Sequence, residues 1–212
     1  IDCGHVAPRD LAQTSPGSPL TLDFAGATVA ASLPLPGRHM VGNAALAAAM
    51  GWRLGMQPEV IAEALRQVRL SGGRLEPKSI RGIHFLDDSY NANPDSMIAG
   101  LDTLAESAAT RRFAVLGAMG ELGEHAAAHD YVRDHASALA LVGLVPGRGV
   151  DAARISDAAR AANPCGVMHF ADHASCAAHL RELLQPGDLV LLKGSRSAAM
   201  EKVLTHFQTA TS

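Results

Sequence analysis

The chain has 212 residues, of which 48% are hydrophobic, and a formal net charge of −3 at pH 7. This length allows one large domain or two small ones, and the apolar content is enough for a substantial core. The slight acidity excludes a nucleic-acid binder that depends on a basic face. No apolar run approaches the roughly 18 residues of a transmembrane helix, so we expect neither nucleic-acid nor membrane partners.

The three cysteines, Cys3, Cys165 and Cys176, are odd in number and scattered, without a C-x-x-C motif. This pattern favours cytosolic thiols over a disulfide framework. No Cys/His pair has the spacing of metal ligands, so no metal site is expected. The chain starts with I-D-C-G-H, without methionine or the features of a signal peptide. We interpret the sequence as a piece of a longer cytoplasmic polypeptide.

The first third of the chain predicts a hairpin followed by two helices. The segments L-T-L-D-F and A-T-V-A-A-S-L are separated by A-G, which is typical of a β-hairpin. The alanine-rich residues 42–54 favour a helix, and Gly55 is placed to end it. Pro58 falls in the first turn of a second helix, E-V-I-A-E-A-L-R-Q-V.

The residues S-G-G-R-L-E-P, 71–77, indicate a linker between domains, and we place the domain boundary between residues 73 and 74. Four apolar strands are predicted beyond it: I-H-F-L-D-D, R-F-A-V-L-G, G-V-M-H-F and D-L-V-L-L-K-G. Helices are predicted at 96–105, from about residue 125, at 150–162, at 173–184 and at 197–207, while L-A-L-V-G-L-V-P fits a helix end or a strand. Apolar strands that alternate with helices predict a Rossmann-like α/β domain with a mostly parallel sheet covered on both faces.

Polar loops follow three of the predicted strands. They are D-D-S-Y-N-A-N-P-D-S at 87–96, A-M-G-E-L-G-E-H at 118–125 and G-S-R-S at 194–197. Ligands of parallel α/β sheets bind at the carboxyl ends of the strands. We therefore expect the three loops to face one crevice.

Each loop also has a purely structural explanation. In the loop 87–96, Asp95 or Ser96 is a possible helix N-cap after Pro94. That explanation leaves four polar residues without a role, which favours a functional loop: Asp88, Tyr90, Asn91 and Asn93.

The second loop is either a flexible turn or a helix N-terminus that binds an anion. It lacks the G-x-G-x-x-G dinucleotide pattern, and Glu121 and Glu124 oppose a phosphate cradle, so both interpretations stay open. In the third loop a solvated lysine and arginine beside a serine cap are the structural alternative. We favour a receiver for a carboxylate or phosphate there.

Five motifs in chain order resemble those of the Mur ligases. They are G-R-H-M-V-G-N-A-A-L-A-A-A, G-R-L-E, D-D-S-Y-N-A-N-P-D-S-M, L-G-A-M-G-E-L-G-E-H and L-L-K-G-S-R-S-A-A-M-E. Within that family they are most similar to the MurF type. The resemblance implies that residues 1–73 are the C-terminal portion of a central ATP-binding domain. Residues 74–212 would be the Rossmann-like C-terminal domain.

The resemblance also implies a reaction, in which ATP and Mg²⁺ activate a UDP-N-acetylmuramoyl-tripeptide as an acyl phosphate. The amine of D-alanyl-D-alanine then attacks, which makes the protein a peptidoglycan-precursor ligase. Such an enzyme is expected to be a cytoplasmic monomer with small-molecule substrates. No G-x-x-x-x-G-K-[ST] phosphate loop occurs in this sequence, and the family's catalytic and metal-binding groups would lie upstream. We expect no catalytic or metal-ligating residue here and no activity from the chain alone.

Roles for individual residues follow from the matched motifs. Asn43 resembles the adenine contact, with His39 lining the same nucleotide pocket, although Asn43 as a helix N-cap is an equally open alternative. Arg74 resembles the arginine that reaches ATP from the linker. Asp88 resembles the aspartate that accepts from the ribose hydroxyls.

The remaining motif residues are assigned to the loop and to the peptide substrate. Tyr90, Asn91 and Asn93 are expected to shape the loop and the contact between domains. A second set is expected to hold the dipeptide's carboxylate or the peptide substrate: Lys193, Ser195 and Arg196. Two rival hypotheses are a Rossmann oxidoreductase, which lacks support because its glycine motif is missing, and a non-catalytic nucleotide-binding or interaction domain.

Overall fold

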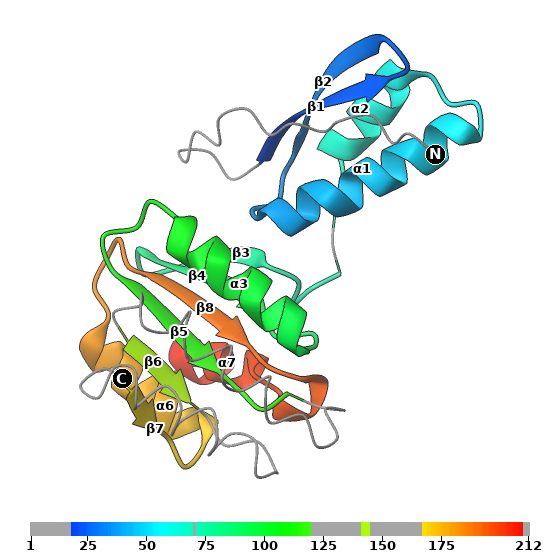
Figure 1. Cartoon of the computed structure of the whole chain (residues 1–212). Helices are drawn as coiled ribbons and strands as arrows, with labels where there is room; N and C mark the ends of the chain where they lie inside the picture. Colours follow the sequence, from blue (N-terminus) through cyan, green and yellow to red (C-terminus); the bar gives the residue numbers. More distant parts are fainter. Residues whose placement is uncertain (1–17, 70, 120–140, 145–166, 210–212) are drawn as a thin grey trace. The chain divides into compact units, whose positions relative to one another are not determined.

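The computed structural model describes residues 18–69, 71–119, 141–144 and 167–209. The chain divides into two compact units, Ile1–Leu70 and Ser71–Ser212, and each is described by itself (Figure 1). This division falls three residues before the boundary that the sequence suggested. Residues 71–73 therefore belong to the second unit.

The first unit contains the predicted hairpin. Strands β1 (Ser18–Phe24) and β2 (Ala27–Leu33) pair antiparallel, with Phe24 opposite Ala27. The two turn residues, Ala25 and Gly26, both have positive φ, of 54° and 103°. This is the turn geometry whose twist matches that of paired strands, so the A-G dipeptide is correctly interpreted as the hairpin turn.

Two helices cover the hairpin. Helix α1 (Arg38–Arg53) starts four residues before the predicted residue 42, because Gly37, with φ 100°, already turns the chain into the helix. Helix α2 (Pro58–Arg66) begins at its proline, as predicted. Gly55 follows α1 with φ 88°, which confirms its place at the helix end.

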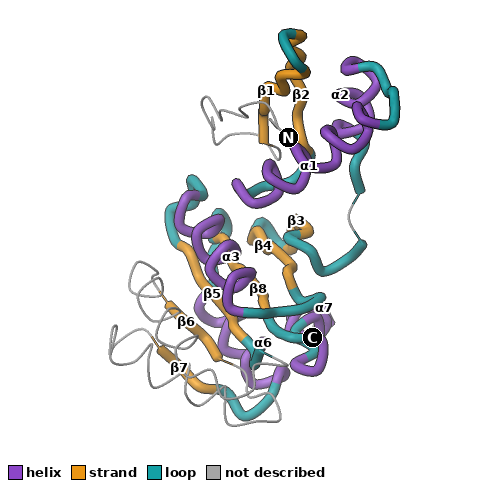
Figure 2. The backbone as a smooth tube through the Cα atoms, turned by 45° about the vertical axis from the view of Figure 1, so that its right-hand side comes forward, coloured by secondary structure: helices purple, strands orange, loops and turns teal. Residues whose placement is uncertain are grey.

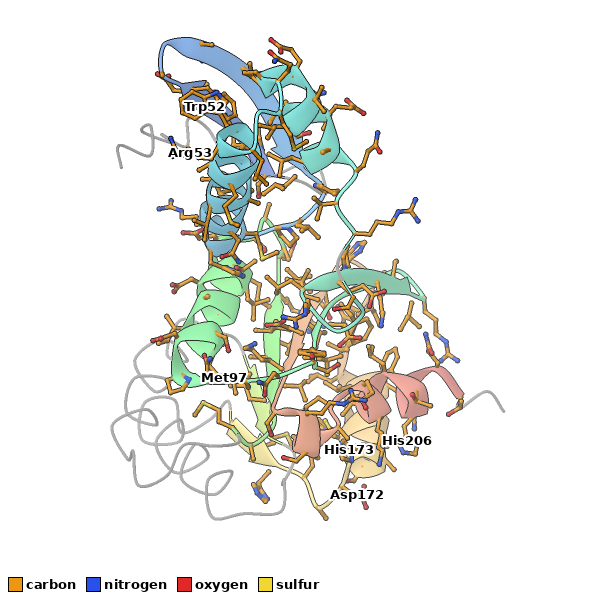
Figure 3. All side chains as sticks on the ribbon, turned by 90° about the vertical axis from the view of Figure 1, so that its right-hand side faces the viewer. Trp52, Arg53, Met97, Asp172, His173 and His206 are labelled. Carbon is orange, nitrogen blue, oxygen red and sulfur yellow. The ribbon has the colours of Figure 1, made fainter. Side chains whose placement is uncertain are left out.

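The core of the first unit lies between the hairpin and the two helices. Its largest members are Leu20, Leu22, Phe24, Leu33, Leu35, Val41, Ile61 and Leu65. Trp52 on α1 meets Phe24 edge-on with ring centroids 5.9 Å apart (Figure 3).

The second unit is built on a six-stranded sheet with the strand order β3-β4-β8-β5-β6-β7. The strands are β3 (Glu76–Ile80), β4 (Ile83–Asp88), β5 (Arg112–Leu116), β6 (Leu141–Leu144), β7 (Val167–His169) and β8 (Leu189–Lys193). All neighbouring pairs are parallel except β3 with β4. The mostly parallel sheet is confirmed, and the ambiguous segment L-A-L-V-G-L-V-P contains a strand. The helices predicted from about residue 125 and at 150–162 lie outside the described residues.

Strand β3 was not expected, because its first residues were assigned to the linker. It forms a hairpin with β4 through Arg81 and Gly82, whose φ angles are 54° and 77°. Pro77 weakens the strand signal in the sequence. It is tolerated because β3 is an edge strand of this sheet.

Helices cover both faces of the sheet, as predicted (Figures 1 and 2). Helix α3 (Pro94–Glu106) packs on β8 and β5 from one side. Helices α6 (His173–Leu183) and α7 (Glu201–Thr209) cover the other side. The core on that side includes Phe85, Phe113, Phe170, Leu180, Val190, Leu192, Val203 and Phe207. The last helix starts at Glu201 rather than 197, because a 3₁₀ turn, η1 (Arg196–Ala198), precedes it. None of the described helices is long and apolar enough to cross a membrane.

An ion pair closes the amino ends of the central strands. Arg111 donates from Nε to Asp188 Oδ1 at 2.8 Å and from Nη2 to Asp188 Oδ2 at 2.5 Å. Asp188 also accepts from Gln185 N at 2.7 Å, and its side chain is only 4% exposed. The Arg111 guanidinium holds the pKa of the Asp188 carboxyl below its usual value. The pair therefore joins the starts of β5 and β8.

The Arg111–Asp188 pair predicts a pH dependence of stability. A carboxyl whose folded pKa is depressed stabilises the fold above its unfolded pKa of about 3.9, and this contribution is lost as the pH falls through the folded pKa. Asp188→Asn should lower the free energy of unfolding of the second unit by about 1.5–3 kcal/mol at pH 7. The difference from wild type should shrink below about pH 4. Urea unfolding at both pH values, followed by NMR signals from the second unit, checks this, and an equal loss at both would contradict it.

Candidate functional site

The three polar loops meet at one edge of the sheet, as far as the described residues extend. Lys193 pairs with Asp88 in the β4–β8 ladder and with Leu116 in the β5–β8 ladder. Beyond the strands, Gly117 N donates to Lys193 O at 2.7 Å, and Ser195 N donates to Ala118 O at 2.9 Å. The expected convergence is confirmed for β4, β5 and β8. Glu121 and Glu124 of the second loop lie outside the described residues.

A buried ion pair lies at the centre of this edge. Lys193 Nζ donates to Asp88 Oδ2 at 2.5 Å and to Asn91 O at 3.2 Å. The exposed fractions of the Lys193 and Asp88 side chains are 2% and 15%. Asp88 Oδ1 accepts from Leu75 N at 3.1 Å. Since a buried charge without partners is costly, hydrogen bonds on both partners are what makes this pair stable.

The segment 73–75, near the start of the second unit, is bound to the loop after β4. Gly73 O accepts from Tyr90 N at 2.8 Å. Gly73 has a φ of 77°, and a Cβ there would come within 3.0 Å of Tyr90 N, so the close approach needs glycine. The Arg74 guanidinium lies over the Tyr90 ring, with Cζ 3.9 Å from the centroid. Arg74 Nε donates to Ser71 Oγ at 3.2 Å.

Much of the polarity of the loop 87–96 serves its own folding. Asn93 is the N-cap of α3, because its side chain accepts from Ser96 N at 2.8 Å while Ser96 Oγ accepts from Asn93 N at 3.0 Å. The suggestion that Asp95 or Ser96 caps the helix is therefore wrong. Pro94 is the first helical residue, and serine at the third position completes a capping box. Asn91 Oδ1 accepts from Ala92 N at 2.9 Å.

The sequence singled out Asp88 but missed its neighbour. Asp87 is buried, accepts from Ser89 Oγ at 2.6 Å and pairs with Lys78 Nζ at 2.5 Å. Successive strand residues face opposite sides of a sheet, so the two aspartates serve different networks. This alternation is the sequence signal that would have assigned Asp87 a partner different from that of Asp88.

The β8–α7 loop carries one buried and one exposed candidate. Ser195 is buried and its Oγ lies 3.0 Å from Ser197 Oγ. Arg196 is 72% exposed, with Nη1 3.6 Å from Glu201 Oε1. Glu201 Oε2 is a buried atom without a hydrogen-bond partner in the structure. The exposed guanidinium is thus held only loosely by its own chain.

Close packing fixes the backbone of this loop. A Cβ on Gly194 would lie 2.6 Å from Met200 Cγ, and one on Gly117 would lie 2.5 Å from Met200 Sδ. His173, at the start of α6, donates from Nε2 to Ala198 O at 2.8 Å (Figure 3). Both glycines directly follow an apolar strand, but nothing else in the sequence marks them as packing residues.

The other two candidates, His39 and Asn43, lie in the first unit. They are four residues apart near the start of α1 and therefore share one helix face. Asn43 is exposed and the N-cap is Gly37. The alternative that Asn43 caps the helix is wrong.

The described residues include no cluster of three or more His, Cys, Asp or Glu side chains that is arranged to hold a metal ion. Cys176 is buried on α6, and burial raises the pKa of its thiol to about 12. It is a core residue that stays protonated.

Comparison with known proteins defines the class. Residues 73–196, more than half of the chain, match the family model of the Mur ligase, glutamate ligase domain. The chain belongs to the Mur ligase family. The match includes every candidate site residue of the second unit and ends before helix α7.

Particular relatives are named UDP-N-acetylmuramoyl-tripeptide–D-alanyl-D-alanine ligase. The one from Escherichia coli is 38% identical over 92% of this chain and 42% of its own length. The one from Mycobacterium tuberculosis is 38% identical over 86% of this chain and 40% of its own length. The chain thus spans about two-fifths of the length of these relatives.

Solved structures show the same architecture. MurF from Acinetobacter baumannii superposes with a TM-score of 0.78 and 30% identity, over 91% of this chain and 43% of that one. MurF from Thermotoga maritima in complex with ADP superposes with a TM-score of 0.79 over 91% of this chain and 43% of that one. At 23% identity, the second comparison supports the fold alone.

The packing around Gly194 predicts that it does not tolerate a side chain. Gly194→Ala would force Met200 and Ala198 apart, and overpacking of this kind costs about 1–3 kcal/mol. Gly42→Ala is the control, since a Cβ there meets nothing within 4 Å. On the exposed surface of α1 it should be neutral or stabilising. Melting temperatures of both variants check this, and an unchanged value for Gly194→Ala would refute the packing argument.

Proposed function

We propose that this chain is the C-terminal part of an ATP-dependent ligase that joins D-alanyl-D-alanine to a UDP-N-acetylmuramoyl-tripeptide. The 38% identity to relatives of that name, over most of this chain, supports the assignment. Residues 1–73 would be the end of the central ATP-binding domain and residues 74–212 the C-terminal domain. The parent would act in the cytoplasm as a monomer.

The observation that carries the proposal is that the carboxyl ends of β4, β8 and β5 lie side by side in the sheet. It brings a carboxylate, an arginine–aromatic stack and an exposed arginine onto loops at one end of a parallel sheet. This is where ligands bind in such sheets. The groups suit a nucleotide and a peptide carboxylate.

Two residues of the second unit are proposed to hold the nucleotide. Asp88 has a donor on each oxygen, but a carboxylate offers about four acceptor positions, so it can also accept from a ribose hydroxyl. Arg74 donates one N–H to Ser71, and its guanidinium lies over the Tyr90 ring, which leaves its other N–H donors for phosphate. Tyr90 is itself 43% exposed and extends the same surface.

The contacts to the adenine and to the peptide substrate are proposed from where the remaining candidate residues lie. Asn43 would contact the adenine, and His39, on the same face of α1, would line the nucleotide pocket. Arg196 is exposed and lies next to the Ser195–Ser197 hydroxyl pair, so it would receive the carboxylate of the dipeptide or peptide substrate. Asn91 and Asn93 support the loop rather than the ligand.

The proposed reaction transfers phosphate from ATP to the terminal carboxylate of the tripeptide. The dipeptide amine attacks the resulting acyl phosphate, and an amide, ADP and phosphate are released. A divalent cation normally neutralises phosphate charge in such transfers. The described residues contain no cluster of three or more potential metal ligands, and the groups that would hold the cation are proposed to lie upstream of this sequence.

The function is tested with a hybrid enzyme. In it, this chain replaces the stretch of the Escherichia coli relative that it matches. The hybrid should ligate D-alanyl-D-alanine to the tripeptide with ATP, whereas the 212-residue chain alone should not, because its sequence has no phosphate loop. The control takes the same stretch from the Mycobacterium tuberculosis relative. A folded but inactive hybrid beside an active control would favour a non-catalytic binding domain.

The division of labour between two arginines gives a further prediction within the active hybrid. Arg74→Met should raise the KM for ATP about tenfold, since a charged hydrogen bond is worth about 1.5 kcal/mol or more. Arg196→Met should raise the KM for a peptide substrate and leave that for ATP unchanged. Each variant is the control for the other. Steady-state kinetics with each substrate varied in turn checks this, and identical KM changes in both variants would contradict it.

A further inference from the structure

Lys193 is an unusual residue because it ends an apolar strand with its side chain inside the fold. It is 2% exposed, and lysine is almost never so deeply buried unless it is paired. It faces α3 at close range, since a Cβ on Gly100 would lie 3.2 Å from Lys193 Cδ. The same Cβ would lie 3.7 Å from Asp88 Oδ2. Glycine at this position of α3 therefore leaves room for the ion pair beneath the helix.

The contacts of the ammonium group argue against a substrate contact. Two of its three N–H donors are used, on Asp88 Oδ2 and on Asn91 O. The surface left is too small for a dipeptide carboxylate to reach the nitrogen. A bound carboxylate would also have to compete with the carboxylate of Asp88.

What Lys193 does is to hold Asp88, and Asp88 holds the segment 73–75. The carboxylate oxygen that does not bind Lys193, Asp88 Oδ1, accepts a hydrogen bond from Leu75 N. Leu75 is buried and has a φ of 48°, a left-handed conformation that is costly for leucine. The hydrogen bond from its N–H helps to keep it there. Arg74, one residue earlier, lies on Tyr90.

We propose that Lys193 is a positioning residue for the nucleotide site and not a contact for the peptide substrate. It acts through Asp88, whose carboxylate it orients so that one oxygen binds Leu75 N–H and fixes the backbone beside Arg74. The effect on the nucleotide rests on the function proposed above. The effect on Leu75 does not, so the two are tested separately.

The first experiment measures amide hydrogen exchange at Leu75 in the 212-residue chain. Lys193→Met leaves Asp88 without its anchor, so exchange at Leu75 should accelerate about tenfold or more, as local opening becomes easier. The control is Lys78→Met, which removes the neighbouring Lys–Asp pair but leaves Asp88 intact. It should not change exchange at Leu75.

A folded Lys193→Met variant with unchanged exchange at Leu75 would overturn the proposal. If Lys193→Met does not fold, Lys193→Gln keeps a donor near Asp88 without the charge. It should accelerate the same amide by a smaller factor. No acceleration in folded Lys193→Gln would then be the overturning result.

The second experiment measures kinetics in the hybrid ligase. Lys193→Met should raise the KM for ATP about tenfold while the KM for D-alanyl-D-alanine stays unchanged. A rise only in the KM for the dipeptide would make Lys193 a substrate contact and overturn the proposal. A lowered melting temperature with both KM values unchanged would show a purely structural role and overturn it as well. If the unsubstituted hybrid is inactive while exchange at Leu75 responds to Lys193→Met, the proposed function fails and the positioning of Leu75 stands.

Discussion

The ion pair between Asp88 and Lys193 is the interaction on which the carboxyl-end loops depend. It joins neighbouring strands, lies beneath α3 and reaches the loop before α3 through Asn91 O. A buried pair gains little if its charges lack other partners, because desolvation offsets the Coulomb attraction. Here the ammonium has a second acceptor and the carboxylate a second donor. The pair is therefore a joint between four segments and not an isolated contact.

Close packing, and not the ion pair, fixes the backbone of the β8–α7 loop. The backbones of Gly117 and Gly194 lie against Met200, whose side chain is fully buried. This contact sets the path of the β8–α7 loop, so that Ser195 turns inward and Arg196 outward. At the opposite end of the strands, Arg111 and Asp188 hold the starts of β5 and β8 together. The central strands are thus constrained at both ends, and the exposed side chains project from a rigid edge.

Features that depend on a few neighbouring residues could be predicted from the sequence. The A-G turn, Gly55 and Pro58 act within a few residues, and the apolar strands are long enough to identify. The convergence of the three loops followed from parallel topology. Strand β3 was missed because a proline and a glycine-rich start weaken its signal, although it pairs with β4 through a two-residue hairpin turn.

The inward direction of Lys193 could not be predicted either, since the last residue of a strand can face α3 or solvent. The N-cap role of Asn93 could have been predicted from local sequence. Asparagine followed by proline, with serine three residues after the asparagine, is a capping pattern. The ligand contacts of Arg74 and Asp88 remain predictions. Their positions reflect contacts within the chain, and a nucleotide adds to those contacts without replacing them.

The unexpected edge strand has a consequence for solubility. An exposed strand edge is a template on which another chain can add a strand and begin to aggregate. On β3, Pro77 has no N–H to offer, and the charged Glu76 and Lys78 flank it. The opposite edge of the described sheet, β7, is only three residues long. Both borders are therefore poor starting points for intermolecular strand pairing, which protects a sheet whose inner strands are strongly apolar.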